Sequence, residues 1–403
     1  MRILLIDVNC KYSSTGKIVY DLYQNLNKKH CEMAIAYGRG TVVKEKNIYK
    51  FGLDFETKIH ALLARLTGYN GCFSPISTWR LLQFVKKFQP DIIHIHELHA
   101  YFVNIKPLLK YIKNKKIKVV WTFHCEYMYT GKCGYAYDCE KWKDECGKCP
   151  AVRQYPKSIL LDQTKSMFQM KKDLLKELDM MIITPSQWLA ERVNQSFLHG
   201  KKIDVIHNGI DTETIFYPRH SSMRDLRKEY GLNGKKIVLA VAPNILDERK
   251  GGAHVLEISE RFSPDVVFVL IGAEKSVWYS TNVLMLQRTK NQDELAEWYS
   301  TADLFLICSK KENFPTTCLE ALSCGTPVVG FDTGGTKETA PGDLGTFVEY
   351  MDYQSLEKSI NDYLQKPRDK QTVREKAVRL YAKEVMCNKY LDIYEKMVKK
   401  ETV

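Results

Sequence analysis

Two glutamates in the second half of the chain have a spacing and a setting that suit a phosphorylated ligand. Glu312 and Glu320 are separated by seven residues within the stretch from Ser309 to Gly335. This stretch predicts a loop, a short helix that opens near Pro315 and stops at Gly325, a strand and a glycine-rich loop. Carboxylates and a flexible backbone around a helix entrance occur where α/β proteins hold phosphorylated ligands. For either glutamate alone, helix capping or a solvated surface is the simpler interpretation.

A basic pair precedes two glycines earlier in the same half. Arg249 and Lys250 are followed by Gly251 and Gly252, between a predicted strand over 235–242 and a predicted helix. Cations neutralise a diphosphate, and glycines let the backbone approach it closely. An isolated Arg-Lys pair is usually a solvated surface, but this position between strand and helix favours ligand binding.

The first half offers Gly16 and His124. A strand over 2–8 leads through a polar loop and Gly16 into an amphipathic helix, which predicts an anion cradle at a helix start. An ordinary loop between a strand and a helix is the alternative. His124 ends a predicted strand over 118–123, where parallel sheets present side chains to ligands, and a structural histidine is its alternative.

Three histidines surround Glu97 at the end of another predicted strand, over 91–96. Alternation along a strand places His94 and His96 on one face and His99 beyond it. A polar cluster facing a ligand is therefore favoured over a metal site.

A cysteine-rich insertion spans residues 125–149. Cys133, Cys139, Cys146 and Cys149 supply four thiolates, the number that surrounds a tetrahedral zinc ion. The first pair is spaced more widely than usual half-sites, so buried free thiols and, least favoured, disulfides stay open beside a structural zinc. Cys125 is a spare sulfur. The chain has twelve cysteines and no signal-peptide pattern, which favours reduced or metal-bound thiols.

Alternating strands and helices in both halves predict an α/β protein with two doubly wound, Rossmann-like domains facing one another across a cleft. We place the domains at 1–209, with the insertion at 125–149, and at 210–380. A polar linker runs through 218–222, and a C-terminal helix over 381–403 packs back toward the first domain. Further strands are predicted at 33–37, 180–184, 205–206, 266–271, 284–286, 304–308, 328–329 and 345–348.

Composition limits the class of protein. With 403 residues and 44% hydrophobic side chains the chain has material for packed cores. A formal charge of +12 suits an anionic partner: a nucleotide phosphate, a lipid head group or nucleic acid. No apolar run approaches the roughly 18 residues that a spanning helix needs. We therefore expect a cytoplasmic protein, with peripheral contact at the inner face of the membrane as an option.

One predicted helix, over 59–66, bears on that option. It combines apolar and basic residues that suit a membrane or a lipid acceptor, although packing on its own sheet is the commoner outcome for such a helix. The residues are Leu62, Leu63 and Leu66 with Lys58, His60 and Arg65.

The spacing of Glu312 and Glu320 resembles the Glu-x7-Glu donor motif of the family-4 retaining glycosyltransferases. Four further runs resemble the capsule and colanic-acid group of that family, whose members carry a comparable cysteine-rich insertion, and the likeness extends from Met1 to about Tyr390. The runs are PDIIHIHELHAYFVN, VVWTFHCEYMYTGKC, CEKWKDECGKCP and TPSQWLAERVNQSF.

The resemblance implies a metal-independent hexosyltransferase of the GT-B fold that acts in surface polysaccharide synthesis. Its second domain holds a UDP- or GDP-linked sugar, and its first domain holds a lipid-linked or oligosaccharide acceptor. Glu320 then binds the ribose hydroxyls, Glu312 and His124 contact the transferred sugar, and Gly16 lies near the phosphates. The remaining donor-binding residues are Asn313, Phe314, Pro315, Thr316 and Gly335.

One departure from the family pattern concerns the phosphate-binding loop. The family loop begins Gly-Arg, whereas this chain has Ala242, Pro243 and Asn244. This leaves Arg249, with Lys250, as the candidate cations.

Two other functions stay open. A nucleotide-sugar hydrolase or epimerase can use the same fold. A zinc-containing nucleic-acid binder fits the charge and the cysteines, but no nucleic-acid motif accompanies them, and no nucleic-acid partner is expected.

Overall fold

The computed structural model describes residues 1–219 and 224–399 in two compact units. The first unit comprises Met1–His207 and Cys387–Val403, and the second comprises Asn208–Met386. Residues 220–222 of the expected linker and residues 400–403 of the expected C-terminal helix lie outside the described residues.

The first unit is built on a seven-stranded parallel sheet with the order β3-β2-β1-β4-β5-β6-β7. The strands are β1 (Arg2–Asp7), β2 (Glu32–Tyr37), β3 (Ile48–Lys50), β4 (Ile92–Ile95), β5 (Lys118–Thr122), β6 (Met180–Thr184) and β7 (Lys202–Val205). The central strands are nearly continuous apolar runs because helices cover both faces of a parallel sheet.

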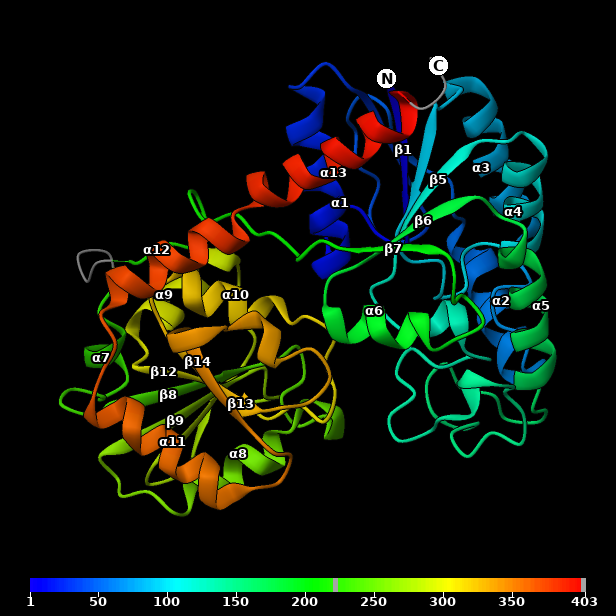
Figure 1. The fold of residues 1–403 in the computed structure, drawn as a ribbon. Helices are drawn as coiled ribbons and strands as arrows, with labels where there is room; N and C mark the ends of the chain where they lie inside the picture. Colours follow the sequence, from blue (N-terminus) through cyan, green and yellow to red (C-terminus); the bar gives the residue numbers. More distant parts are fainter. Residues whose placement is uncertain (220–223, 400–403) are drawn as a thin grey trace. The chain divides into compact units, whose positions relative to one another are not determined.

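Helices α3, α4 and α5 lie on one face of this sheet, and α1 and α13 lie on the other (Figure 1). The helices of the unit are α1 (Ser13–Asn27), α2 (Asp54–Thr67), α3 (Pro75–Phe88), α4 (Ile105–Asn114), α5 (Thr164–Lys176), α6 (Gln187–Asn194) and most of α13 (Lys383–Lys399), with 3-10 turns η1 (Tyr127–Tyr129) and η2 (Lys141–Lys143).

The C-terminal part of α13 is fixed to the first sheet by polar contacts. The hydroxyl of Tyr394 lies 2.6 Å from Nδ1 of His94, and the hydroxyl of Tyr390 lies 2.8 Å from that of Thr122. Lys118 also donates to the backbone carbonyl of Met397 at 2.7 Å. The last described helix therefore completes the unit that the first strand begins.

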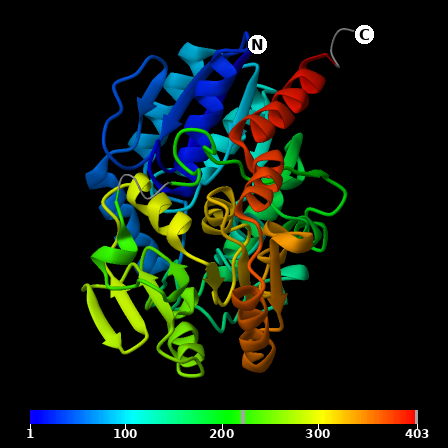
Figure 2. The ribbon, with the colours of Figure 1, turned by 90° about the vertical axis from the view of Figure 1, so that its left-hand side faces the viewer.

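The second unit has its own seven-stranded sheet, with the order β10-β11-β9-β8-β12-β13-β14. Its strands are β8 (Lys236–Val241), β9 (Val266–Ile271), β10 (Val277–Ser280), β11 (Val283–Leu286), β12 (Leu304–Ile307), β13 (Val328–Phe331) and β14 (Gly345–Val348). All pairs are parallel except the β10–β11 hairpin, which forms one edge of the sheet (Figure 2).

Two apolar cores cover the two faces of this second sheet. One contains residues of α9 (Gln292–Thr301), α10 (Thr316–Ser323) and α12 (Lys370–Tyr381), and the other contains residues of α8 (Gly252–Ser259) and α11 (Tyr353–Gln365). The remaining elements are α7 (Leu226–Glu229), η3 (Glu248–Lys250), η4 (Lys337–Thr339) and η5 (Gly342–Leu344). Two parallel, helix-covered sheets confirm the α/β, doubly wound prediction.

The strand predictions lie within a few residues of the observed strands, and β9 has the predicted bounds. The sequence did not indicate β3, β10, α4, α5 or α7. Helices α12 and α13 are separated at Ala382, whose backbone pairs with Ile210. A residue that pairs in this way cannot continue a helix.

Among the described helices, none combines the length and the apolar character needed to cross a membrane.

Candidate active site

The strand order places the expected ligand-binding loops of the second unit side by side. The order reverses between β8 and β12, and ligands of such sheets bind beyond the carboxyl ends of the strands at this point. The loop after β8 carries Arg249 and Lys250, and the loop after β12 carries Glu312.

The loop after β8 depends on its two glycines. Gly251 has a φ of +73°, and a Cβ there would lie 1.9 Å from the carbonyl oxygen of Cys308; a Cβ on Gly252 would lie 2.1 Å from that of Ile245. The Asp247 side chain accepts from the Arg249 amide at 3.0 Å and caps η3. Because no larger residue fits, the glycines bring the basic pair against the end of β12.

Glu312 lies between the two cations. The ammonium of Lys250 is 2.5 Å from Oε1 of Glu312, and Nη1 of Arg249 is 3.2 Å from the same oxygen. Glu312 is only 6% exposed, and a buried carboxylate is unfavourable unless it is paired. Two cations against one carboxylate leave a local excess of positive charge, which suits an added anion.

The glycine-rich loop is fastened to the backbone of Glu312. The Gly335 amide donates to the Glu312 carbonyl at 3.0 Å, and a Cβ on Gly334 would lie 2.0 Å from that oxygen. Thr333 donates to the Ser309 carbonyl at 2.7 Å, and Thr336 to that of Phe331 at 2.9 Å. These hydrogen bonds therefore join the two ends of the stretch from Ser309 to Gly335 into one structural element.

Helix α10 begins and ends as its sequence predicts. Pro315 is the N-cap residue, Thr316 is the first helical residue, and Gly325 ends the helix with a φ of +85°. Just before it, Asn313 and Phe314 are buried, and the Phe314 carbonyl accepts from Asn208 at 3.3 Å. The backbone between Glu312 and α10 is thus held in place.

Glu320 is held by a different partner from Glu312. It lies on α10, is 8% exposed, and accepts a hydrogen bond from the Tyr299 hydroxyl at 3.0 Å. Burial, reinforced by Glu320, raises the pKa of Tyr299 well above its usual value, so Tyr299 remains a donor.

In the first unit the strand order reverses between β1 and β4, and Gly16 lies in the first turn of α1. Its carbonyl accepts from the Lys11 amide at 3.1 Å, and a Cβ there would lie 3.2 Å from Asn9. Lys11 and Ser13 have φ values of 67° and 61°. Such left-handed non-glycine residues store strain and gather at functional sites.

Asp7 is a site residue that the sequence analysis did not single out. It is fully buried at the end of β1, and it accepts from the Glu97 amide at 3.2 Å and the Thr15 hydroxyl at 3.3 Å. Burial, and then the charge of Glu97, raises the pKa of Asp7 to about 7. An ionisable residue closing an otherwise apolar strand was the available signal.

His124 is half-buried against the buried His96 at the same edge. Its Nε2 lies 3.0 Å from Nδ1 of His96, and the two rings stack with centroids 5.3 Å apart. Burial lowers the pKa of His124 to about 4, so the imidazole is neutral at physiological pH. A neutral His124 offers a hydrogen bond and no positive charge.

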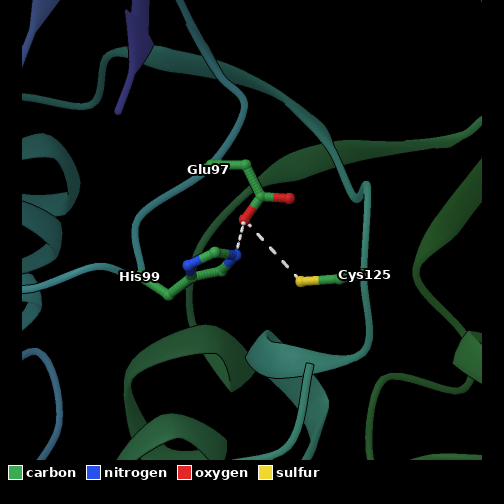
Figure 3. Close-up of side chains that lie close together, drawn as sticks. All are labelled: Glu97, His99 and Cys125. Carbon is green, nitrogen blue, oxygen red and sulfur yellow. Dashed lines mark hydrogen bonds and ion pairs between the residues drawn. The ribbon is translucent and has the colours of Figure 1, made fainter. Parts of the chain in front are cut away.

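Glu97 forms a compact group with His99 and Cys125 (Figure 3). Nε2 of His99 lies 2.5 Å from the Glu97 carboxylate, and the Cys125 thiol donates to the same oxygen at 3.6 Å. Burial alone would lower the pKa of His99, but the Glu97 charge outweighs it and the pKa is raised. Among the described residues, these are the only three His, Cys, Asp or Glu side chains that form a group of three or more with all ligand atoms within 4.8 Å of one another. Cys125, expected to be a spare sulfur, is therefore a hydrogen-bond partner of Glu97.

The four cysteines of the insertion surround one cavity of about 20 Å³, together with Trp142. The Gly131 amide donates to the Cys146 sulfur at 3.2 Å, and a hydrogen bond from Cys133 lowers the pKa of Cys149 to about 6. All twelve cysteines are free, but no three sulfurs of the insertion lie as close together as the Glu97 group. The donors suit zinc, although the sulfurs do not form a compact tetrahedron.

Comparison with known proteins relates both halves of the chain to sugar transfer. Residues 15–214 match the family described as Glycosyltransferase Family 4, and residues 222–380 match Glycosyl transferases group 1. The chain is 24% identical over 422 residues to the putative colanic acid biosynthesis glycosyl transferase WcaC of Escherichia coli K12, covering 98% of this chain and 100% of WcaC.

Solved structures share the fold at low sequence identity. Sucrose-phosphate synthase from Thermosynechococcus elongatus superposes with a TM-score of 0.72 at 15% identity, covering 99% of both chains. Anabaena HepE, solved in complex with UDP-glucose, gives 0.67 at 15% identity, covering 98% of this chain and all of HepE. Because family models match both halves and these solved structures share the fold over nearly the whole chain, the chain belongs to the family-4 glycosyltransferases, retaining enzymes of the GT-B fold that use nucleotide sugars.

Proposed function

We propose that this enzyme transfers a sugar from a UDP- or GDP-linked donor to a lipid-linked or polysaccharide acceptor during the synthesis of a bacterial surface polysaccharide. The observation that carries the proposal is the buried Glu312 carboxylate between Arg249 and Lys250, at the strand-order reversal of the second sheet. This grouping combines a diphosphate site with a carboxylate for sugar hydroxyls.

The similarity to WcaC over nearly the whole chain supports the polysaccharide assignment. The UDP and UDP-glucose in the HepE structures support a UDP-linked donor over a GDP-linked one. We therefore also propose that the reaction takes place in the cytoplasm.

In this proposal the second unit holds the donor. Arg249 and Lys250 bind the diphosphate, and Glu312 binds hydroxyls of the transferred sugar beside residues 313–316. Glu320, which Tyr299 orients, binds the ribose hydroxyls. The Gly335 N–H stays on the Glu312 carbonyl, and the turn that follows Gly335 adds N–H groups toward the phosphates.

The cations supply the main catalytic effect. The bond between the sugar's anomeric carbon and the phosphate oxygen breaks, and an acceptor oxygen bonds to the same face of that carbon. The acceptor's proton passes to the leaving phosphate oxygen. Negative charge builds up on the diphosphate, and fixed cations stabilise such charge without reorganising. This chemistry needs no metal ion.

In the first unit we assign Gly16 to the loop near the phosphates and His124 to the sugar. The neutral His124 donates or accepts a hydrogen bond at a sugar hydroxyl. Its neutrality follows from burial.

Donor screening and product analysis test the proposed function. A UDP-sugar is expected to raise the melting temperature, because a ligand that binds only the folded state stabilises it. With an undecaprenyl-linked oligosaccharide, that donor should give a product whose new linkage keeps the donor's anomeric configuration. Nucleotide release at the same rate without any acceptor would instead indicate a hydrolase.

We also propose a structural zinc ion at Cys133, Cys139, Cys146 and Cys149. Their common cavity, the amide bonded to Cys146 and the acidic Cys149 thiol support this choice over the Glu97 group, where His99 already neutralises the carboxylate. Zinc would order the insertion and play no part in sugar transfer.

Metal analysis of protein purified without chelator tests the zinc site. We expect about one zinc per chain, lost in Cys149→Ser and kept in the matched variant Cys125→Ser. Zinc-free wild-type protein, or loss in Cys125→Ser alone, would contradict the assignment.

A further inference from the structure

Helix α2 presents an apolar face to solvent. Phe55, Ile59, Leu62 and Leu66 follow one another at intervals of four, three and four residues, so they form one stripe along the helix. Their exposures are 55%, 52%, 56% and 36%.

The opposite face of α2 is polar and buried. Glu56 accepts from the amides of Ile76 and Ser77 at 2.8 and 2.7 Å, and His60 lies 2.7 Å from the Ser74 hydroxyl. His60 is fully buried, so the surface expected from the sequence is wrong in including it. A surface helix of a globular protein normally buries its apolar stripe, whereas α2 buries a polar face and exposes its apolar stripe.

A second apolar segment adjoins the C-terminal end of α2. The amide of Ile159 donates to the Arg65 carbonyl at 2.7 Å, and a Cβ on Gly68 would lie 2.7 Å from the Leu161 carbonyl. Residues 159–161 are 51%, 68% and 50% exposed although the backbone is tied down. We call the α2 stripe and residues 159–161 together the apolar face. Large continuous apolar surfaces of this kind mark contact sites.

Basic residues accompany the apolar face. Lys58 and Arg65 on α2, and Arg153 and Lys157 before residues 159–161, are exposed, and none forms an ion pair within the described residues. The neighbouring carboxylates are engaged: Asp54 pairs with Lys50 at 3.0 Å, and Asp162 accepts from backbone amides. The face therefore combines apolar side chains with an excess of positive charge, four cations against the one unpaired carboxylate of Asp162.

We infer that the apolar face docks the enzyme on an anionic lipid bilayer. Apolar side chains enter the interfacial region of a bilayer, and flanking lysine and arginine are attracted to anionic head groups. A second copy of the chain fits less well, because a two-fold contact would set these cations against their own copies. The inference goes beyond the proposed function. It rests on that function in one respect: a lipid-linked acceptor would lie in the membrane on which the enzyme docks.

Vesicle binding tests this inference without any donor sugar. Wild-type protein should co-sediment with vesicles of equal parts phosphatidylglycerol and phosphatidylcholine, less with phosphatidylcholine alone, and less at high salt. Leu62→Gln with Leu160→Gln, and separately Lys58→Glu with Arg65→Glu, should each weaken binding by about tenfold or more. The changed side chains are exposed, so the variants should fold.

Matched controls show whether binding depends on this face or on any exposed apolar or basic side chain. Leu380→Gln removes an exposed leucine from α12, and Lys86→Glu with Lys87→Glu reverses two exposed cations on α3. Both controls should bind about as wild type does. Equal binding by all variants, no binding by wild type, or a wild-type dimer that the leucine variant dissociates would overturn the inference.

Transfer to a short water-soluble acceptor keeps this test independent of the proposed function. The face variants should retain that activity while losing vesicle binding. Wild-type protein that binds the vesicles but transfers no sugar to this acceptor would instead count against the proposed function alone.

Discussion

Replacing Lys250 with methionine is expected to lower kcat/KM for sugar transfer by about 10²–10³-fold, the effect of removing one preorganised charge-stabilising group. Methionine keeps the length and much of the volume of lysine but removes the ammonium group that lies 2.5 Å from Glu312. The loss should fall mainly on kcat, because charge on the diphosphate is greatest in the transition state.

Two variants sharpen this test. Lys250→Arg keeps the charge with a different geometry and should recover part of the activity. Lys376→Met removes a cation from α12 that pairs with Asp343 at the surface, and it should leave kcat/KM near the wild-type value. Steady-state kinetics with matched melting temperatures measures the effect, and full activity in Lys250→Met would exclude a role for Lys250.

The architecture was largely predictable because apolar runs of strand length alternate with amphipathic segments. Local features of the sequence explain why α4 and α5 were not predicted. Pro107 resembles a helix breaker, but it falls in the first turn of α4, where its missing N–H costs nothing. In α5 the buried Lys171 interrupts the apolar pattern, and its contacts with the carbonyls of Tyr127 and Thr130 and with the Tyr127 ring explain its burial.

The break between α12 and α13 could not be predicted from the residues around it, for a different reason. It depends on Ile210, which lies far away in the sequence and pairs with Ala382. Helix propensity is a weak preference that such tertiary contacts override.

The sequence allowed the residues of the candidate site to be predicted, but not the contacts between them. Glycines, cations and glutamates were found because each follows a strand at the ligand-binding edge of its sheet. The sharing of Glu312 by Arg249 and Lys250 depends on side chains more than sixty residues apart in the sequence. The grouping of Cys125 with Glu97, and the raised pKa of Asp7, likewise arise from neighbouring strands and from burial.

Replacing Glu312 with glutamine is the second change with a large expected effect, again about 10²–10³-fold in kcat/KM. Glutamine has the same shape and can still accept hydrogen bonds, but it removes the negative charge between two cations. The lost ion pairs should also lower the melting temperature slightly. Glu248→Gln, in the loop that carries the basic pair, removes a carboxylate that is 90% exposed and should have little effect on either quantity.

The structure allows two interpretations of such a loss, because Glu312 contacts Lys250 and is also proposed to contact the sugar. The double variant Lys250→Met/Glu312→Gln separates them, since residues that act through one contact are not additive. If Glu312 only positions Lys250, the double variant should be no worse than Lys250→Met alone. If Glu312 binds the sugar, it should lose a further factor of about ten or more, and donors lacking the contacted hydroxyl should not show that extra loss. We expect the second result, because a buried carboxylate that served only to hold lysine in place would weaken the positive charge that the departing diphosphate needs.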